Sequence, residues 1–327
     1  MAFDGAGRDP VSGEGMKSAL LQWLRSHPDV VSGETLSAVL HTSRVTIWNH
    51  IQKLQGLGYD IQATPKGYRL AASPDIPYPF EFPEREGHMH HVETIDSTMD
   101  LAKTLARDGC PHFTVVVAER QTRGKGRLRR TWISDVGGLY FTIVLRPEIP
   151  VSHVMRYPFA ASVVLCRTIR RMTGIDARVK WPNDILAGQA KLAGMLCEME
   201  AETDLVSFVN IGIGVNVNND PEPAEQKACS LRNILGRPVE RVALLREFLD
   251  TYEATIGALD PAAVMREWKS LSATLGKQVR IVTPERVTEG RAVDIDTNGN
   301  LILETQNRTL ETILYGDCFE VPNQPNA

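Results

Sequence analysis

The chain has 327 residues, of which 43% are hydrophobic and 23% are charged, and its formal net charge is −4. This composition is typical of a globular protein with about two or three domains, and it excludes a membrane-spanning helix because no apolar run approaches the ~18 residues that one needs. The polar first residues, MAFDGAGRDPVSGEG, lack the basic and apolar regions of a secretory signal, and the five scattered cysteines form no CxxC pair, so we expect a cytoplasmic protein with reduced thiols.

The first part of the chain carries the pattern of a winged helix-turn-helix. Apolar residues recur at three- and four-residue spacing over 16–24, 36–40 and 45–54, which predicts three helices. Ser32 and Ser43 precede the second and third helices as expected N-caps. The stretch GLGYDIQATPKGYRL then alternates and turns, which suits a two-stranded wing. We therefore predict a DNA-binding domain over residues 14–70.

The charge of this region favours a nucleic-acid partner. Lysines and arginines outnumber acids between Lys17 and Leu70, although the whole chain is negative. The third helix, SRVTIWNHIQKLQ, contains no acid and carries side chains able to bond phosphates and base edges. These candidates are Ser43, Arg44, Thr46, Asn49, His50, Gln52 and Lys53. A small interaction domain with a solvated polar face is the alternative. A single such module would bind DNA weakly, so a DNA role requires a dimer on two half-sites.

Four prolines in residues 71–87, AASPDIPYPFEFPEREG, predict a stiff extended linker. The HMHH run at 88–91 is expected at the surface of this linker and not at a metal. Residues 88–272 then alternate between strands and helices. Strands are predicted at 113–119, 138–147, 178–184, 191–200 and 205–218, the last two antiparallel, and helices at 98–109, 154–172 and 241–259. We expect a mixed sheet with helices on one face.

The last part of the chain reads as all-β. Asn298 and Gly299 stand between two alternating segments, which is the strongest short-range hairpin signal. We predict a small barrel over residues 273–322 and a disordered tail, PNQPNA.

One segment concentrates positive charge in this acidic chain. ERQTRGKGRLRRTW, residues 119–132, combines cations with Gly124 and Gly126, and its freed amides and charges would form an anion trap. The loop is neither a Walker A motif nor a dinucleotide fingerprint. Taken alone, it could also be a solvated surface loop.

Downstream stretches give this loop a context. KWPNDILAGQAKLAG at 180–194, DST at 96–98, AERQ before the loop and NIGIGVNVN at 210–218 together resemble the biotin protein ligase family. The resemblance covers most of the chain and includes the regulatory type with an amino-terminal winged helix. It implies a multidomain α+β fold, with a class II synthetase-like catalytic domain at 88–272 and an SH3-like β-barrel at 273–322.

The resemblance also implies a reaction. Such a biotin–[acetyl-CoA-carboxylase] ligase joins the carboxylate of biotin to the α-phosphate of ATP, with Mg²⁺, and passes biotin from biotinyl-5′-AMP to a lysine of the biotin carboxyl carrier protein. Both reactants of the first step are anions, which explains a need for fixed cations. The regulatory type further implies a homodimer that forms with biotinyl-5′-AMP and represses biotin synthesis genes at an operator.

The family's site residues carry over onto matching positions. As catalytic residues the resemblance implies Lys191, Arg127 and Asp184. For the biotin site it implies Ser97, Thr98, Met99, Gln121, Lys125, Gly126, Arg127, Lys191 and Gly194. For the adenylate it implies Lys125, Arg127, Trp132, Asn183 and Asn216. No metal ligand and no ATP contact in the carboxy-terminal barrel can be assigned.

The loop departs from the family's fullest form, GRGRRGR. Here it reads GKGRLRR, so Lys125 and Leu128 replace arginines and Arg129 replaces a glycine. Lysine keeps the charge without the bidentate fork, and loss of the glycine narrows the freedom of the backbone.

Simpler interpretations of single residues stay open. Ser97 could only cap a helix, Trp132 could be core, and Lys180 could pair with a carboxylate, whereas Trp181 is expected in the core. For the whole chain, a lipoate ligase and a transcription factor with a ligand-sensing domain are the alternatives.

Overall fold

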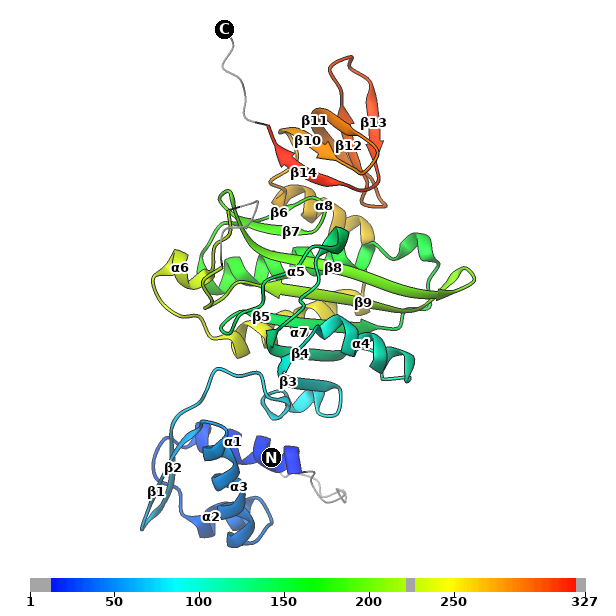
Figure 1. The fold of residues 1–327 in the computed structure, drawn as a ribbon. Coiled ribbons are helices and arrows are strands. Elements are labelled where there is room, and N and C mark those ends of the chain that lie inside the picture. The colour runs from blue at the N-terminus through cyan, green and yellow to red at the C-terminus, as the bar shows by residue number, and fades with distance from the viewer. Residues whose placement is uncertain (1–12, 222–226, 322–327) are drawn as a thin grey trace. The chain divides into compact units, whose positions relative to one another are not determined.

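The computed structural model describes residues 13–221 and 227–321, and the chain falls into two compact units, residues 1–91 and 92–327 (Figure 1). The amino-terminal stretch and the PNQPNA tail lie outside the described residues. The predicted domain limits of 14–70, 88–272 and 273–322 stay predictions.

The first unit contains the predicted three helices and wing. Its elements are α1 (Gly13–Ser26), α2 (Gly33–Val39), α3 (Arg44–Gly56), β1 (Asp60–Thr64) and β2 (Gly67–Ala72). The Ser32 hydroxyl accepts from the Thr35 amide at 3.0 Å, and the Ser43 hydroxyl accepts from the Thr46 amide at 3.1 Å, so both predicted N-caps are confirmed. The winged helix-turn-helix is therefore the fold of this region.

The prediction of an extended linker is wrong for residues 79–85. These residues form two short 3₁₀ turns, η1 (Pro79–Glu81) and η2 (Pro83–Arg85), within the first unit. Phe80 belongs to the hydrophobic core of the three helices. The Glu81 carboxylate accepts from both Arg25 nitrogens, at 2.8 and 2.7 Å, and from the Tyr59 hydroxyl. The segment is therefore buried against residues that are distant in sequence, and Arg25 supplies the counter-charge for Glu81. The prolines of the segment do not predict these contacts.

The second unit is built on a seven-stranded sheet. Its order is β3 (Met89–Ile95), β4 (Thr114–Gln121), β5 (Leu139–Leu145), β9 (Leu205–Val215), β8 (Ala190–Glu202), β7 (Asp184–Ala187) and β6 (Ala177–Lys180). Neighbours from β4 to β6 in this order are antiparallel. The amides of Thr122 and Arg123 donate to the carbonyls of Ile95 and Asp96, so the chain runs in the same direction at the β3 edge. The predicted mixed sheet is confirmed.

Two local predictions change in this sheet. His90 and His91 lie in β3, not in a surface linker. The stretch RVKWPND, predicted as one strand, contains most of β6, a turn at residues 181–183 and the first residue of β7. Pro182 has no amide to donate to a ladder, which favours a turn at this point.

Helices cover both faces of the sheet, where the sequence predicts one. Phe141 of β5 meets Phe248 of α7 (Arg241–Gly257), with ring centroids 5.4 Å apart. The next residue, Thr142, donates to the Thr98 hydroxyl of α4 (Thr98–Arg107) at 2.9 Å. Because successive side chains of a strand point to opposite faces, α4 lies opposite α7. The remaining helical elements are η3 (Arg127–Arg129), η4 (Val151–His153), α5 (Arg156–Thr173), α6 (Leu231–Leu235) and α8 (Pro261–Leu271).

The carboxy-terminal region is a five-stranded antiparallel sheet in the same unit. Its order is β13 (Leu310–Ile313), β12 (Leu301–Glu304), β11 (Val287–Ile295), β10 (Gln278–Val282) and β14 (Asp317–Glu320). The predicted hairpin joins β11 to β12, with Gly299 at φ +85°. The Gly299 carbonyl accepts from the indole nitrogen of Trp181 at 2.9 Å, and Trp181 is buried as predicted.

All five cysteines are free thiols, as expected. No helix within the described ranges is long and apolar enough to span a membrane.

Candidate functional site

A cavity of about 260 Å³ lies in the second unit, between the α4 face of the sheet, the basic loop and β14. Every residue predicted for the catalytic, biotin and adenylate sites lines it. These residues are Ser97, Thr98, Met99, Gln121, Lys125, Gly126, Arg127, Trp132, Asn183, Asp184, Lys191, Gly194 and Asn216. Residues spread over 120 positions of the sequence therefore surround one cavity.

A row of four facing residues runs across the sheet along this cavity. Gly214 of β9 is opposite Gly194 of β8, Gly194 is opposite Asp184 of β7, and Asp184 is opposite Lys180 of β6. Directly opposite residues share a face, so all four face the cavity. The row passes from uncharged glycines to charged side chains.

The two glycines let Trp132 lie directly on the sheet. A Cβ at Gly214 would stand 2.4 Å from the indole nitrogen of Trp132, and one at Gly194 would stand 2.9 Å from its ring. The indole nitrogen is buried and donates no hydrogen bond. Trp132 is thus a wall of the cavity.

The neutral end of the cavity is a hydrogen-bonding group. The side-chain oxygen of Gln121 accepts from the Thr98 amide at 2.8 Å and from the Thr98 hydroxyl at 3.1 Å, while its nitrogen donates to Ser134 at 2.8 Å. Ser97 is fully buried, and its hydroxyl has no hydrogen-bond partner within the described ranges. Ser97 is the N-cap residue of α4, but its side chain makes no cap hydrogen bond, so the interpretation of this hydroxyl as a simple cap is wrong. A buried hydroxyl without a partner is costly unless a ligand satisfies it.

The other end of the cavity is cationic. The Lys191 ammonium lies 2.7 Å from an Asp184 oxygen and 5.2 Å from the centre of a Trp132 ring. Arg127 donates to neutral oxygens, the Asn183 side chain and the Gly316 carbonyl, both at 3.3 Å. Burial lowers the pKa of Arg127, against the raising effect of Asp317 and Asp184. A half-buried guanidinium that has no paired carboxylate among the described residues is suited to receive an anion.

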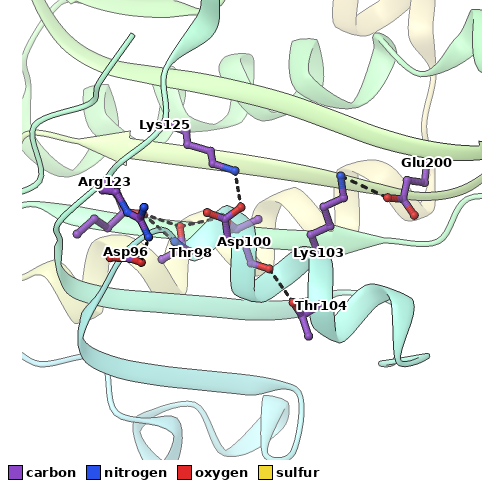
Figure 2. A network of polar contacts seen from close by, with 10 residues as sticks. Asp96, Thr98, Asp100, Lys103, Thr104, Arg123, Lys125 and Glu200 are labelled. Carbon is purple, nitrogen blue, oxygen red and sulfur yellow. Dashed lines mark hydrogen bonds and ion pairs between the residues drawn. The ribbon is translucent and has the colours of Figure 1, made fainter. Parts of the chain in front are cut away.

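The basic loop is anchored by ion pairs. Arg123 pairs with Asp96, and Lys125 pairs with Asp100 on α4 (Figure 2). At the far end of the loop, Arg130 lies 2.5 Å from Asp317 of β14. Part of the charge that the sequence concentrates here is therefore balanced by local carboxylates. Of the remaining loop cations, Arg127 lines the cavity.

The carboxy-terminal sheet contributes a wall that the sequence did not predict. Asp317, Cys318 and Phe319 of β14 line the cavity. Burial raises the pKa of the Cys318 thiol to about 12, so this cysteine is a neutral wall residue. The stretch DCF carries no motif, and only the packing of the two sheets brings it to the site.

The exposed face of α3 differs in part from the predicted DNA-binding face. The Ser43 and Thr46 side chains bond each other at 2.9 Å within the N-cap. His50 is buried and faces the core instead of solvent. The exposed side of α3 keeps the predicted Arg44, Asn49, Gln52 and Lys53 and adds two apolar residues, Val45 and Trp48.

Comparison with known proteins identifies the family. Models match the HTH domain at residues 17–69, the biotin/lipoate A/B protein ligase family at 91–216 and the biotin protein ligase C terminal domain at 274–319. The bifunctional ligase/repressor BirA of Bacillus spizizenii is 35% identical over 295 residues, which cover 85% of this chain and 90% of that protein. The chain belongs to the biotin protein ligase family.

Other members of the biotin protein ligase family agree with this assignment. BirA of Escherichia coli is 28% identical over 299 residues, covering 84% of this chain and 88% of the relative. Among solved structures, the biotin protein ligase of Aquifex aeolicus in complex with biotin and ATP is similar with a TM-score of 0.61 and 27% identity, covering 71% of this chain and 98% of that chain.

Proposed function

We propose that this member of the family is a biotin–[biotin carboxyl-carrier protein] ligase and a biotin-responsive repressor of biotin synthesis genes. The ligase half rests on one observation. A single cavity joins a neutral hydrogen-bonding end, which includes the unpartnered Ser97 hydroxyl, to a cationic end around Lys191 and Arg127. Biotin has the same polarity, with a neutral ureido group at one end and a carboxylate at the other.

The neutral end binds and orients the ureido group. Ser97 supplies a hydroxyl free to donate or accept, and the bonds of Gln121 hold Thr98 beside it. Met99 and Gly194 border the rings of biotin. Buried polar groups that lose their partner are costly, so a substrate without the ureido group binds less well here.

The cationic end carries the first step. A carboxylate oxygen of biotin attacks the α-phosphorus of ATP, the bond to the bridging oxygen of the β-phosphate breaks, and pyrophosphate leaves with the electron pair. Lys191 and Arg127 stabilise the charge that develops on the phosphate oxygens, in a cavity where little water screens them. Lys125 and Gly126 close the loop over the product, and we assign Trp132, Asn183 and Asn216 to the adenylate.

The second step transfers biotin from the mixed anhydride to a lysine amine of the carrier protein, and AMP leaves. The incoming amine must lose a proton before it attacks. We assign to Asp184 the role of accepting this proton. Its carboxylate lies 2.7 Å from the Lys191 ammonium.

The described residues contain no group of three or more His, Cys, Asp or Glu side chains that could hold a metal ion. Mg²⁺ in nucleotide sites is held largely by phosphate oxygens and water, with one or two carboxylates, and Asp184 fits such a role. Bound there, Mg²⁺ would neutralise phosphate charge.

The test is transfer of biotin to a carrier domain, followed by mass, with biotin, ATP and Mg²⁺. We expect Lys191→Ala to reduce the rate by about 100-fold or more, because it removes a cation from the reacting phosphate. The matched control is Lys277→Ala, since Lys277 pairs with Glu320 at 2.9 Å outside the cavity and its loss leaves the rate unchanged. Transfer that survives in Lys191→Ala would contradict the assignment.

The same assay separates the alternatives. A lipoate ligase would transfer lipoate in place of biotin. A sensor without catalysis would bind biotin and transfer nothing.

The repressor half rests on the winged helix-turn-helix and on the acid-free α3. We assign operator contacts to Ser43, Arg44, Thr46, Asn49 and Lys53, and we propose a homodimer that forms with biotinyl-5′-AMP. The ligase half needs ATP and the repressor half needs operator DNA, so we propose a cytoplasmic location.

A further inference from the structure

Lys180 is a cation of the cavity for which residues 13–221 and 227–321 supply no ion-pair partner. It ends β6, is half-buried and lines the cavity next to β14. Within the described part of the chain, its ammonium makes no hydrogen bond and no ion pair. The sequence left open whether Lys180 pairs with a carboxylate, and it pairs with none of the carboxylates that the structure describes.

The other cations that line the cavity are already engaged. Lys191 pairs with Asp184, Lys125 with Asp100 and Arg130 with Asp317, while Arg127 donates to two neutral oxygens. Removing an ammonium from water without a counter-charge costs free energy, and this cost is offset when an anion binds. Lys180 and Arg127 are therefore the lining cations without a paired carboxylate among the described residues, and of the two only Lys180 also makes no hydrogen bond there, so it is prepared to receive a charge that the ligand brings.

The position of Lys180 says which part of a ligand it meets. It is the last member of the row Gly214, Gly194, Asp184, Lys180. Adjacent strands lie about 4.8 Å apart, so Lys180 is roughly 14 Å from Gly214 and one strand beyond the Asp184–Lys191 pair. Burial raises the pKa of the Cys318 thiol, and the Lys180 ammonium opposes this, so the ammonium also lies close to β14.

We propose that Lys180 binds the β- and γ-phosphates of ATP and then the pyrophosphate that leaves. This inference rests on the proposed function, in which the carboxylate of biotin and the α-phosphate meet at Lys191. The two remaining phosphates then extend along the row toward β6. When the bond between the α-phosphorus and the bridging oxygen breaks, the electron pair moves onto pyrophosphate, and the Lys180 ammonium stabilises that added charge.

The proposal separates the two steps of the reaction. Lys180→Met keeps the length and the apolar part of the side chain and removes the charge. We expect kcat/KM for ATP in adenylate formation to fall by about 10- to 100-fold, which is the usual range for one buried charged hydrogen bond. Transfer from chemically prepared biotinyl-5′-AMP should stay within about twofold of the original protein, because no pyrophosphate takes part in it.

Two further variants complete the design. Lys180→Arg, which restores the charge, should recover most of the lost ATP dependence. Lys277→Met, a lysine of the carboxy-terminal sheet paired with Glu320 and outside the cavity, should leave both steps unchanged. Equal losses in both steps of Lys180→Met would show a structural role and overturn the proposal.

A binding measurement makes the outcome independent of catalysis. Calorimetry with pyrophosphate as the only ligand should give a Kd about 10- to 100-fold weaker for Lys180→Met than for the original protein. Unchanged pyrophosphate binding overturns the role of Lys180. Failure of the original protein to form biotinyl-5′-AMP would instead overturn the proposed ligase, and the two results are distinct.

Discussion

At the residue scale, His50 shows how a polar residue of α3 serves the fold. Its side chain is buried, and its Nδ1 has no hydrogen-bond partner. Burial lowers the pKa of His50 below 6.5, and the charges of Lys53 and Lys17 lower it further, against an opposing effect of Glu14. The folded state therefore prefers the neutral imidazole more strongly than the unfolded state does.

The pKa of His50 predicts a direction for stability against pH. The stabilisation is fully present above pH 6.5, and it is lost as pH falls below 6.5 toward the lower folded pKa, because the unfolded chain then binds the proton more readily. We expect amide exchange in α3, corrected for its intrinsic pH dependence, to be faster at pH 5.5 than at pH 7.5. In His50→Gln this difference should disappear. A difference that persists in His50→Gln would assign the effect to another group.

Serine positions show what a local pattern can and cannot predict. Ser32, Ser43 and Ser97 each precede a helix, and the same rule predicts a cap at all three. The first two cap their helices, whereas the Ser97 hydroxyl remains unpartnered in the cavity. Only the resemblance to a ligase family indicated the second role. The local sequence cannot, because the next residue, Thr98, bonds Gln121 and Thr142 on strands, at sequence separations of 23 and 44.

At the scale of elements, the segment 79–85 is held to the first unit by one buried cluster. The Glu81 side chain is 2% exposed and binds Arg25 in a bidentate pair, and the Tyr59 hydroxyl donates to the same carboxylate. The pKa values of both partners of Glu81 are raised. Hydrogen bonding to Glu81 raises the pKa of Arg25, and burial raises the pKa of Tyr59. The cluster joins α1, the start of the wing and η1.

Removing the carboxylate should weaken this unit measurably. We expect Glu81→Ala to lower the free energy of unfolding by about 2–3 kcal/mol, because it leaves a partly buried guanidinium and a buried hydroxyl without their partner. The matched control is Glu14→Ala, which breaks the surface pair with Lys17 in the same unit and should cost less than about 0.5 kcal/mol. Denaturant unfolding monitored on the first unit measures both. Equal effects of the two variants would contradict a structural role for the cluster.

The elements that the sequence predicted correctly depend on local patterns. The caps and the apolar periodicity of α2 and α3 are of this kind, as is the turn at Gly299. The errors arise where a contact with a residue distant in sequence determines the local structure. Arg25 is 56 residues from Glu81, and the second helix-covered face of the sheet follows from Thr142 meeting Thr98 across 44 residues. The β14 wall of the site was missed for the same reason.

At the scale of the whole molecule, the cavity is completed by segments from both ends of the second unit. Arg130 of the loop pairs with Asp317, and Arg127 donates to the Gly316 carbonyl. The loop that would close on the adenylate is therefore already tied to the carboxy-terminal sheet. Leu128 and Arg129 between these contacts have φ values of +53° and +61°, which L-residues adopt at a cost of about 1–2 kcal/mol each. Arg129 thus takes the conformation for which the family's loop has a glycine.

The proposed repressor links this cavity to DNA, and that link can be measured. A duplex selected from random sequences in the presence of biotin and ATP serves as the operator. We expect its affinity to be at least about tenfold higher with biotin and ATP than without them, because ligand-linked ordering favours the dimer that holds two half-sites. Ser97→Ala should remove this response by weakening biotin binding, and it should leave the weak ligand-free DNA binding unchanged.

A substitution in α3 should weaken DNA binding and leave the response to biotin and ATP intact. Lys53 is exposed at the end of α3, and Lys53→Gln removes one expected phosphate interaction from each protomer. Operator affinity should fall for all sequences alike, and the slope of log affinity against log salt should decrease by about 1 for each phosphate that lysine no longer neutralises, while carrier biotinylation stays unchanged. Fluorescence anisotropy across salt concentrations measures the slope. Operator affinity that is equal with and without biotin and ATP would remove the regulatory half of the proposal and leave the ligase half intact, because the cavity of the second unit does not depend on α3.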